Sequence, residues 1–258
     1  MDPMLIVVFL FGALVGSFLN VCIYRLPREE SIAWPASHCP TCLRAIAPYD
    51  NIPVISYVVL GGRCRACRAA ISLRYPVVEL ANALGWVAIV AYFGWTPVSA
   101  AYAALFSSLL VITGTDLSHT IIPDSVTLPG IGVGLICAAT ILPVGFVNGV
   151  LGVLIGGGLL WSLAVVSPYL FGKEGMGGGD IKLLAMVGAF LGWRAALLTI
   201  MIGALTGSIV GVSLIVFKIL RRDEYIPFGP FLALGALVAL FFHQTVLDWY
   251  WGFLDPHP

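Results

Sequence analysis

Residues 4–24 read MLIVVFLFGALVGSFLNVCIY, an apolar run without a charged side chain that only Ser17 and Asn20 interrupt. About 20 apolar residues are enough for a helix to cross the hydrocarbon core of a bilayer. Arg25 and Arg28 follow the run and no basic residue precedes it, whereas a secretory signal peptide carries its positive charge before the apolar region. The stretch therefore predicts a membrane-spanning helix.

The composition of the whole chain agrees with this interpretation. Of the 258 residues, 60% are apolar and 10% are charged, whereas charged residues make up about 25% of an average soluble protein. Thirteen basic and thirteen acidic side chains leave a formal net charge of zero. These values exclude a soluble enzyme, a nucleic-acid binder with a basic face and a disordered chain. A polytopic membrane protein remains.

Further apolar segments follow the first one along the chain. They lie at about 76–93, 97–115, 126–143, 147–171, 183–192, 195–217 and 228–249. A backbone inside a bilayer must satisfy its own hydrogen bonds, and the alternating pattern of a transmembrane barrel does not occur here. We therefore expect an all-α polytopic membrane protein with about eight transmembrane helices.

The basic residues predict the orientation of these helices. With the N-terminus outside, the cytoplasmic segments are 25–75, 116–125, 172–182 and 218–227, and they hold 12 of the 13 basic residues, with Arg194 as the exception. Cytoplasmic loops of membrane proteins carry an excess of Lys and Arg. The sequence thus predicts a topology with the N-terminus outside and these polar segments in the cytoplasm.

The long polar segment 25–75 separates a first helix, 1–24, from a membrane core predicted over 76–258. It contains two C-x-x-C pairs with 21 residues between them, formed by Cys39, Cys42, Cys64 and Cys67. Two such pairs at about this spacing are typical of a zinc site, and four thiolates leave no open coordination position, so the site would be structural. Redox chemistry and disulfides are the alternatives, and disulfides are rare in the cytoplasm.

Three aspartates lie at the predicted cytoplasmic boundary. Asp116 ends the third apolar segment, Asp124 follows Pro123, and Asp180 ends the glycine-rich loop 175–180. Ionisable residues in or beside a membrane span are candidates for function. Two carboxylates at one depth can act as an aspartic protease, because one takes a proton from water while the other, protonated, polarises the carbonyl.

Each aspartate also has a structural interpretation. Asp124 and Asp180 both precede apolar runs and could cap helices, because Asp is a favoured N-cap residue. Asp116 has no obvious basic neighbour in the sequence. The glycines before Asp180, with Gly177 and Gly179 in supporting positions, let a substrate backbone approach closely. They do not have the spacing of a phosphate-binding loop.

Taken together, these motifs resemble the type IV prepilin peptidases, leader peptidases and N-methyltransferases of bacterial inner membranes. The resemblance runs over nearly the whole chain, through the cysteine pairs, Asp116 and residues 16–21 (GSFLNV), 24–27 (YRLP), 51–53 (NIP), 74–80 (RYPVVEL), 123–124 (PD), 175–180 (GMGGGD) and 227–231 (PFGPF). The G-x-G-D element alone is shared with other intramembrane aspartic proteases. The ordered set is far more specific.

This resemblance implies a function and assigns residues to it. Members of the family remove the leader of type IV prepilins or type II secretion pseudopilins at the cytoplasmic face. They then methylate the new N-terminus with S-adenosylmethionine. The catalytic aspartates would be Asp116 and Asp180, with Asp124 in support, and the four cysteines would hold zinc. No G-x-G-x-x-G element is present for the methyl donor, so methyl transfer rests on the resemblance, with the 25–75 loop and Glu79 as plausible contributors.

Two other classes of protein remain as alternatives on the residues alone. A transporter or channel could use the three aspartates as ion or proton sites, but this leaves the cysteine pairs and the glycines before Asp180 without a role. A membrane scaffold stabilised by zinc would need the aspartates only as helix caps. Cleavage of a prepilin by the wild-type protein and by aspartate variants separates all three.

Overall fold

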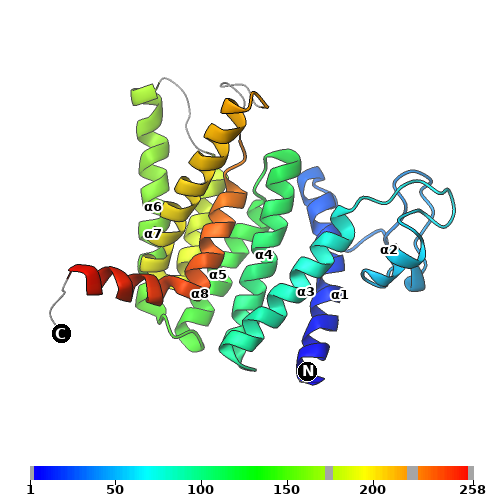
Figure 1. The fold of residues 1–258 in the computed structure, drawn as a ribbon, viewed down its shortest axis with the longest axis horizontal. Helices are drawn as coiled ribbons and strands as arrows, with labels where there is room; N and C mark the ends of the chain where they lie inside the picture. The colour runs from blue at the N-terminus through cyan, green and yellow to red at the C-terminus, as the bar shows by residue number, and fades with distance from the viewer. Residues whose placement is uncertain (1–2, 172–176, 220–225, 255–258) are drawn as a thin grey trace. The chain divides into compact units, whose positions relative to one another are not determined.

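The computed structural model describes residues 3–171, 177–219 and 226–254, without the side chains of 170–171 and 247–254. Over these ranges the regular secondary structure is helical, apart from two isolated β-bridges in the largely irregular segment 26–73. In chain order the elements are α1 (Pro3–Arg25), η1 (Leu26–Arg28), η2 (Pro48–Asp50), α2 (Ile55–Val59), α3 (Arg74–Phe93), α4 (Pro97–His119), α5 (Asp124–Thr140), α6 (Phe146–Phe171), α7 (Gly178–Val216) and α8 (Gly229–Leu254). Figure 1 labels the eight α-helices. The predicted all-α fold is confirmed.

Six of the described helices are long and apolar enough to cross a membrane, namely α1, α3, α4, α6, α7 and α8, and α5 is a shorter apolar helix. The protein is therefore a multi-pass membrane protein. The eight predicted segments fall on these seven helices because the sixth and seventh both lie in α7. Lys173, Arg221 and Arg222, which entered the prediction of orientation, lie outside the described residues.

The chain forms two compact units, Met1–Thr115 and Asp116–Pro258. In the first, α1 packs against α3 so closely that a methyl group at Gly12 would lie 2.9 Å from the Cα of Ala83. Asn82 is fully buried there, and its amide donates to the carbonyl of Gly12 at 2.7 Å. Its Oδ1 accepts the hydroxyl of Ser107 at 2.8 Å. One amide thus links α1, α3 and α4 inside the apolar unit.

In the second unit, α7 folds back on itself at Gly192. This glycine has φ 82° and ψ 173°, a conformation that glycine adopts without the steric cost of a side chain. A methyl group at Gly156 would lie 3.0 Å from the carbonyl oxygen of Leu184 and 3.3 Å from the Cβ of Ala196. In one straight helix, residues 184 and 196 would be about 18 Å apart. The two legs of α7, on either side of Gly192, therefore correspond to the sixth and seventh predicted segments.

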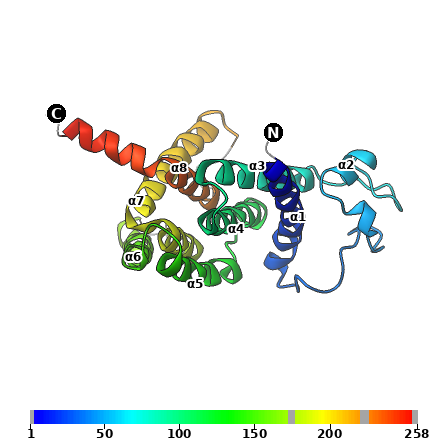
Figure 2. The ribbon, with the colours of Figure 1, turned by 90° about the horizontal axis from the view of Figure 1, so that it is seen from below.

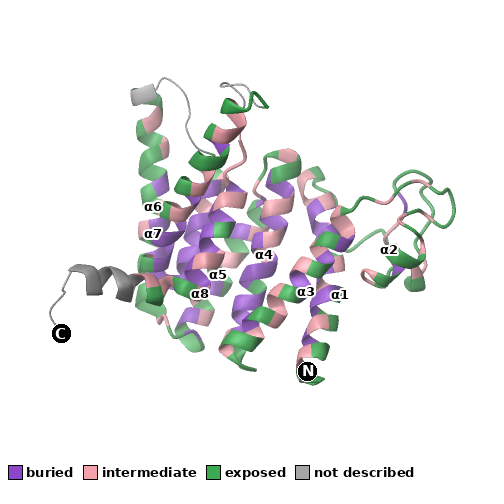
Figure 3. Ribbon diagram, viewed as in Figure 1, coloured by how far each residue is buried: buried purple, intermediate pink, exposed green. Residues whose placement is uncertain are grey.

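The first leg of α7, residues 178–191, forms the centre of this unit. All of its residues from 183 onward are buried, which Figure 3 shows as purple ribbon. Glycines of α6 face it, and a methyl group at Gly152 would lie 2.2 Å from the carbonyl oxygen of Gly188. Figure 2 shows α5 and α6 beside this part of α7. The leg begins at Gly178, so Asp180 lies in its first turn.

The polar segment between α1 and α3 is joined to these helices by partly buried hydrogen bonds. The guanidinium of Arg25 donates to the carbonyl oxygens of Ser31 at 2.9 Å and Pro35 at 2.7 Å. The backbone N–H of Val54 donates to Oε2 of Glu79 in α3 at 2.7 Å. These bonds join a segment with little regular structure to α1 and α3 of the first unit.

Candidate functional site

Asp116 lies near the end of α4, and its side chain is buried, with a residue exposure of 3%. The backbone N–H of Gly229 donates to its Oδ2 at 2.8 Å. A methyl group at Gly229 would lie 2.6 Å from the same oxygen. The first residue of α8 can therefore approach Asp116 this closely only as glycine. Gly229 belongs to the motif at 227–231, but its contact with Asp116 was not predicted.

Asp180 is equally buried, with an exposure of 3%. Gly177 occupies the N-cap position of α7, so the interpretation of Asp180 as the N-cap is wrong. The backbone N–H of Gly177 hydrogen-bonds the carboxylate of Asp180, while Oδ1 of Asp180 has no partner among the described atoms. One oxygen of this carboxyl group is thus free to bind a water molecule or a substrate.

The two carboxyl groups lie in one part of the second unit although they are 64 positions apart in the sequence, because Ile122 contacts the segments beside both of them. They lie close enough for the charge of Asp116 to act directly on Asp180. Two neighbouring buried carboxylates cannot both stay ionised at low energetic cost, so such a pair tends to share one proton. A pair with one proton can supply both a general base and a general acid.

Ile122 packs against two glycines near the aspartates. One is Gly179, which directly precedes Asp180, and the other is Gly229, which donates a hydrogen bond to Asp116. A methyl group at Gly179 would lie 2.7 Å from the Cβ of Ile122, and one at Gly229 would lie 3.3 Å from its Cδ1. Packing against Ile122 therefore favours glycine at position 179, and the predicted role of Gly177 and Gly179 in substrate approach stays a prediction. Ile122 itself gave no signal in the sequence, because an apolar residue before Pro123 is unremarkable in an apolar chain.

Asp124 is not part of the buried pair. It is the first residue of α5, and the N-cap position is Pro123, so the predicted capping role is wrong. Both of its carboxylate oxygens lie 2.7 Å from Nζ of Lys182 in α7. Their side chains are 56% and 36% exposed, so the ion pair links the beginnings of α5 and α7 at a solvated surface. Lys182 is two residues beyond Asp180 in the sequence.

The four cysteines of the polar segment come together in one cluster. Their sulfur atoms all lie within 4.8 Å of one another, and the Sγ atoms of Cys39 and Cys67 are 3.8 Å apart. Tetrahedral zinc with Zn–S bonds of about 2.3 Å places its sulfur ligands about 3.8 Å apart. The cluster can therefore hold zinc with four protein ligands.

Each C-x-x-C pair forms the same turn. Cys39 N–H donates to Arg44 O, and Leu43 N–H donates back to Cys39 O; Cys64 makes the corresponding bonds with Ala69 and Arg68. The backbone N–H of Cys42, which hydrogen-bonds the sulfur, lowers the pKa of Cys39 to about 6. A lower thiol pKa favours the thiolate, which is the form that binds metal.

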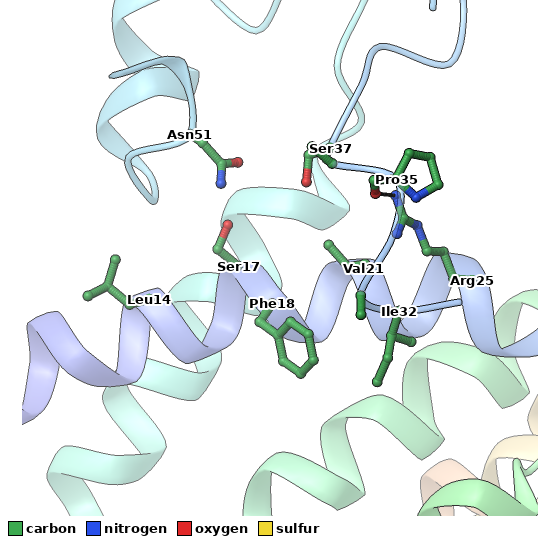
Figure 4. A pocket seen from close by; sticks show the side chains of 11 residues that line it. Leu14, Ser17, Phe18, Val21, Arg25, Ile32, Pro35, Ser37 and Asn51 are labelled. Atoms are coloured by element: carbon green, nitrogen blue, oxygen red, sulfur yellow. Dashed lines mark hydrogen bonds between the residues drawn. The ribbon is translucent and has the colours of Figure 1, made fainter. Parts of the chain in front are cut away.

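A cavity lies in the first unit between α1 and the loop after it (Figure 4). Its volume is about 240 Å³, somewhat below the range of about 300–1,000 Å³ for small-molecule sites, and one side of it is open. Ser17 and Asn51 point toward one another across it in Figure 4. This cavity could not be predicted from the sequence, because its wall combines residues of α1 with residues of the irregular loop.

Two family models match the chain. The model of the bacterial peptidase A24 N-terminal domain matches residues 10–93, and the model of the type IV leader peptidase family matches residues 103–212. The boundary between the two matches lies within residues 94–102.

Curated relatives extend the match to nearly the full chain. A protein of Aeromonas salmonicida and one of Pseudomonas aeruginosa, both named prepilin leader peptidase/N-methyltransferase, are each 39% identical to it. The alignments cover 94% and 95% of this chain and 92% of each relative. A Burkholderia pseudomallei protein of the same name is 37% identical over 90% of this chain and 83% of its own length. No solved structure matches the chain.

Proposed function

Because the chain belongs to the type IV leader peptidase family, we propose that it cleaves the leader from type IV prepilins or type II secretion pseudopilins and methylates the new N-terminus. The observation that carries the peptidase is the buried pair of Asp116 and Asp180 in one unit. The proposal of methyl transfer is supported by the names of the relatives.

Cleavage uses the two aspartates as base and acid. The ionised carboxylate takes a proton from a water molecule, whose oxygen attacks the scissile carbonyl carbon, while the protonated carboxyl group polarises the carbonyl oxygen. The tetrahedral centre then collapses, the C–N bond breaks, and the leaving amine takes a proton from the pair. Water attacks directly, so no acyl-enzyme forms. The unpartnered Oδ1 of Asp180 provides a site for the water or the carbonyl.

Methyl transfer acts on the amine that cleavage releases. S-adenosylmethionine supplies the methyl group, which forms a bond to the amine nitrogen while the electron pair of the C–S bond returns to sulfur. The chain must bind this donor and let the pilin N-terminus lose a proton, because an ammonium nitrogen has no lone pair for attack.

The placement of the protein follows from the same proposal. It lies in the bacterial inner membrane with the N-terminus outside, and both the aspartate pair and the cysteine cluster face the cytoplasm. A prepilin is an apolar helix whose cleavage site lies at this boundary. It can reach buried aspartates laterally from the lipid.

The segment 25–75 is proposed to be a small zinc-binding domain between the first helix and the membrane core at 76–258. Such short segments seldom fold without a disulfide or a metal. Four cysteine ligands leave no open position on the zinc, so the metal stabilises the segment and takes no part in cleavage.

The experiment is to incubate the purified full chain in lipid nanodiscs with prepilins and pseudopilins and S-adenosylmethionine labelled in its methyl group. We expect leader removal, followed by one labelled methyl group on the mature N-terminus. Intact substrates after incubation with several pilins and pseudopilins would overturn the peptidase, and cleaved but unlabelled products would overturn the methyl transfer.

A further inference from the structure

Glu79 is a buried carboxylate in a helix long enough to span the membrane, and cleavage does not use it. Its exposure is 6%, and it accepts the backbone N–H of Val54 at 2.7 Å. Among the described residues no basic side chain lies within ion-pair distance of it. A buried carboxylate without a cation is energetically costly in a membrane helix, and such residues mark functional sites.

The carboxylate of Glu79 contacts a residue that lines the cavity. It hydrogen-bonds the side chain of Ser17, which lines the cavity together with Asn51. Asn51 in turn is three residues before Val54, the other partner of Glu79. A cation in the cavity would therefore be close to the negative charge of Glu79.

The other end of the cavity carries a positive charge. Arg25 lines it and is 5% exposed. It lies eight residues beyond Ser17 on α1, a rise of about 12 Å along the helix. Apolar side chains of Phe18, Val21 and Ile32 form the wall between the two ends. This arrangement suits an elongated ligand with both charges and an apolar portion.

We propose that this cavity binds the methyl donor. The carboxylate of Glu79 attracts the positive charge of the donor, and the guanidinium of Arg25 attracts the carboxylate of the donor. The inference rests on the methyl transfer of the proposed function. S-adenosylmethionine combines a sulfonium, an ammonium, a carboxylate and a flat adenine ring. The side chains of Asn51 and Ser37, which have no hydrogen-bond partner among the described residues, supply polar contacts to it.

Two variants of the full chain test the site, with binding of S-adenosylmethionine measured by equilibrium dialysis in nanodiscs. Glu79→Gln removes the charge but keeps an oxygen for the Val54 N–H, and Ser17→Leu fills the cavity with a residue that suits a membrane helix. We expect each to weaken binding by about 30-fold or more. Methylation of a previously cleaved pilin falls in parallel, while prepilin cleavage stays near the wild-type rate.

The control is Asp50→Asn, which removes a carboxylate of the same unit that pairs with Arg65 at 2.7 Å and does not line the cavity. It should bind S-adenosylmethionine as the wild type does. If Glu79→Gln also abolishes cleavage, that variant is misfolded. The affinity of Ser17→Leu for S-adenosylmethionine then tests the site alone.

Three results would contradict the proposed site or the proposed methyl transfer. Wild-type affinity for S-adenosylmethionine in both variants would overturn the proposed site. Unchanged affinity with a raised KM for the cleaved pilin would also overturn it, because Glu79 would then bind the pilin amine. If the wild type itself neither binds S-adenosylmethionine nor methylates, the proposed methyl transfer fails rather than the location of its site.

Discussion

The backbone N–H of Gly229 donates to Oδ2 of Asp116 at 2.8 Å, joining residues 113 positions apart. This bond fixes one oxygen of a buried carboxyl group, and the same glycine leaves no room for a side chain beside it. The Gly177 N–H bond to Asp180 serves the other carboxylate in a similar way. Backbone groups thus orient both aspartates without adding a charge to the site.

Substitution of Gly229 should therefore impair cleavage. In Gly229→Ala the new methyl group would lie 2.6 Å from Asp116 Oδ2 and must displace the carboxylate. A shift of about 1 Å in a catalytic group can lower the rate about 100-fold. We expect a loss of this size in kcat, with little change in KM for the prepilin.

Gly132→Ala is the matched control, because a methyl group there meets no atom within 4 Å. Methylation of a previously cleaved pilin should persist in both variants. Normal cleavage kinetics in Gly229→Ala would show that the Asp116 contact has no role in the reaction.

The contact between Gly179 and Ile122 predicts a second pair of variants. Gly179→Ala would place a methyl group 2.7 Å from the Cβ of Ile122, whereas a methyl group at Gly178 meets nothing within 4 Å. We expect Gly179→Ala to lower the cleavage rate about 10-fold or more and Gly178→Ala to be nearly neutral. Adding Ile122→Gly to Gly179→Ala removes the Cβ that the new methyl group would meet and should restore part of the activity. No restoration in the double variant would argue against this packing explanation.

The ion pair of Asp124 and Lys182 predicts only a small effect. Both side chains are more than a third exposed, and exposed ion pairs contribute about 0.2–1 kcal/mol to stability. Asp124→Asn should lower the thermal unfolding midpoint slightly and leave prepilin cleavage within about fivefold of the wild type. A loss of cleavage as complete as that expected for Asp180→Asn would instead place Asp124 in the catalytic machinery.

Removal of thiolates from the cysteine cluster should remove zinc. Metal analysis of the purified wild type should find about one zinc ion per chain, because one ion takes four cysteine ligands. Cys39→Ser with Cys42→Ser leaves two ligands and should lose the metal. Cys137→Ser in α5 lies outside the cluster and should retain it. Full zinc content in the Cys39 and Cys42 double variant would show that the metal, if any, binds elsewhere.

Several features could be predicted from the sequence because they depend on local composition. The first helix was predicted over 4–24 and is observed as Pro3–Arg25. The spacing of Cys39 and Cys42 indicated a cluster that the structure assembles. Asp116 and Asp180 were predicted to lie at one depth, and in the structure both are buried and within electrostatic range of one another.

The remaining features depend on contacts between distant residues. The bond from Gly229 to Asp116 and the packing of Ile122 against Gly179 arise only when separate helices come together. Periodicity in an apolar chain does not reveal such pairs. The predicted sixth segment, at 183–192, starts too late because the glycines before Asp180 resemble a loop, whereas Gly178 and Gly179 already belong to α7.

The central claim is that Asp116 and Asp180 together hydrolyse the prepilin leader. Cleavage should be measured in membranes that contain the wild type, Asp116→Asn or Asp180→Asn at equal expression, with Asp124→Asn as the control. We expect each substitution in the pair to lower the cleavage rate by about 10²–10⁴-fold, while methylation of a previously cleaved pilin continues. Undiminished cleavage by both variants would contradict the account.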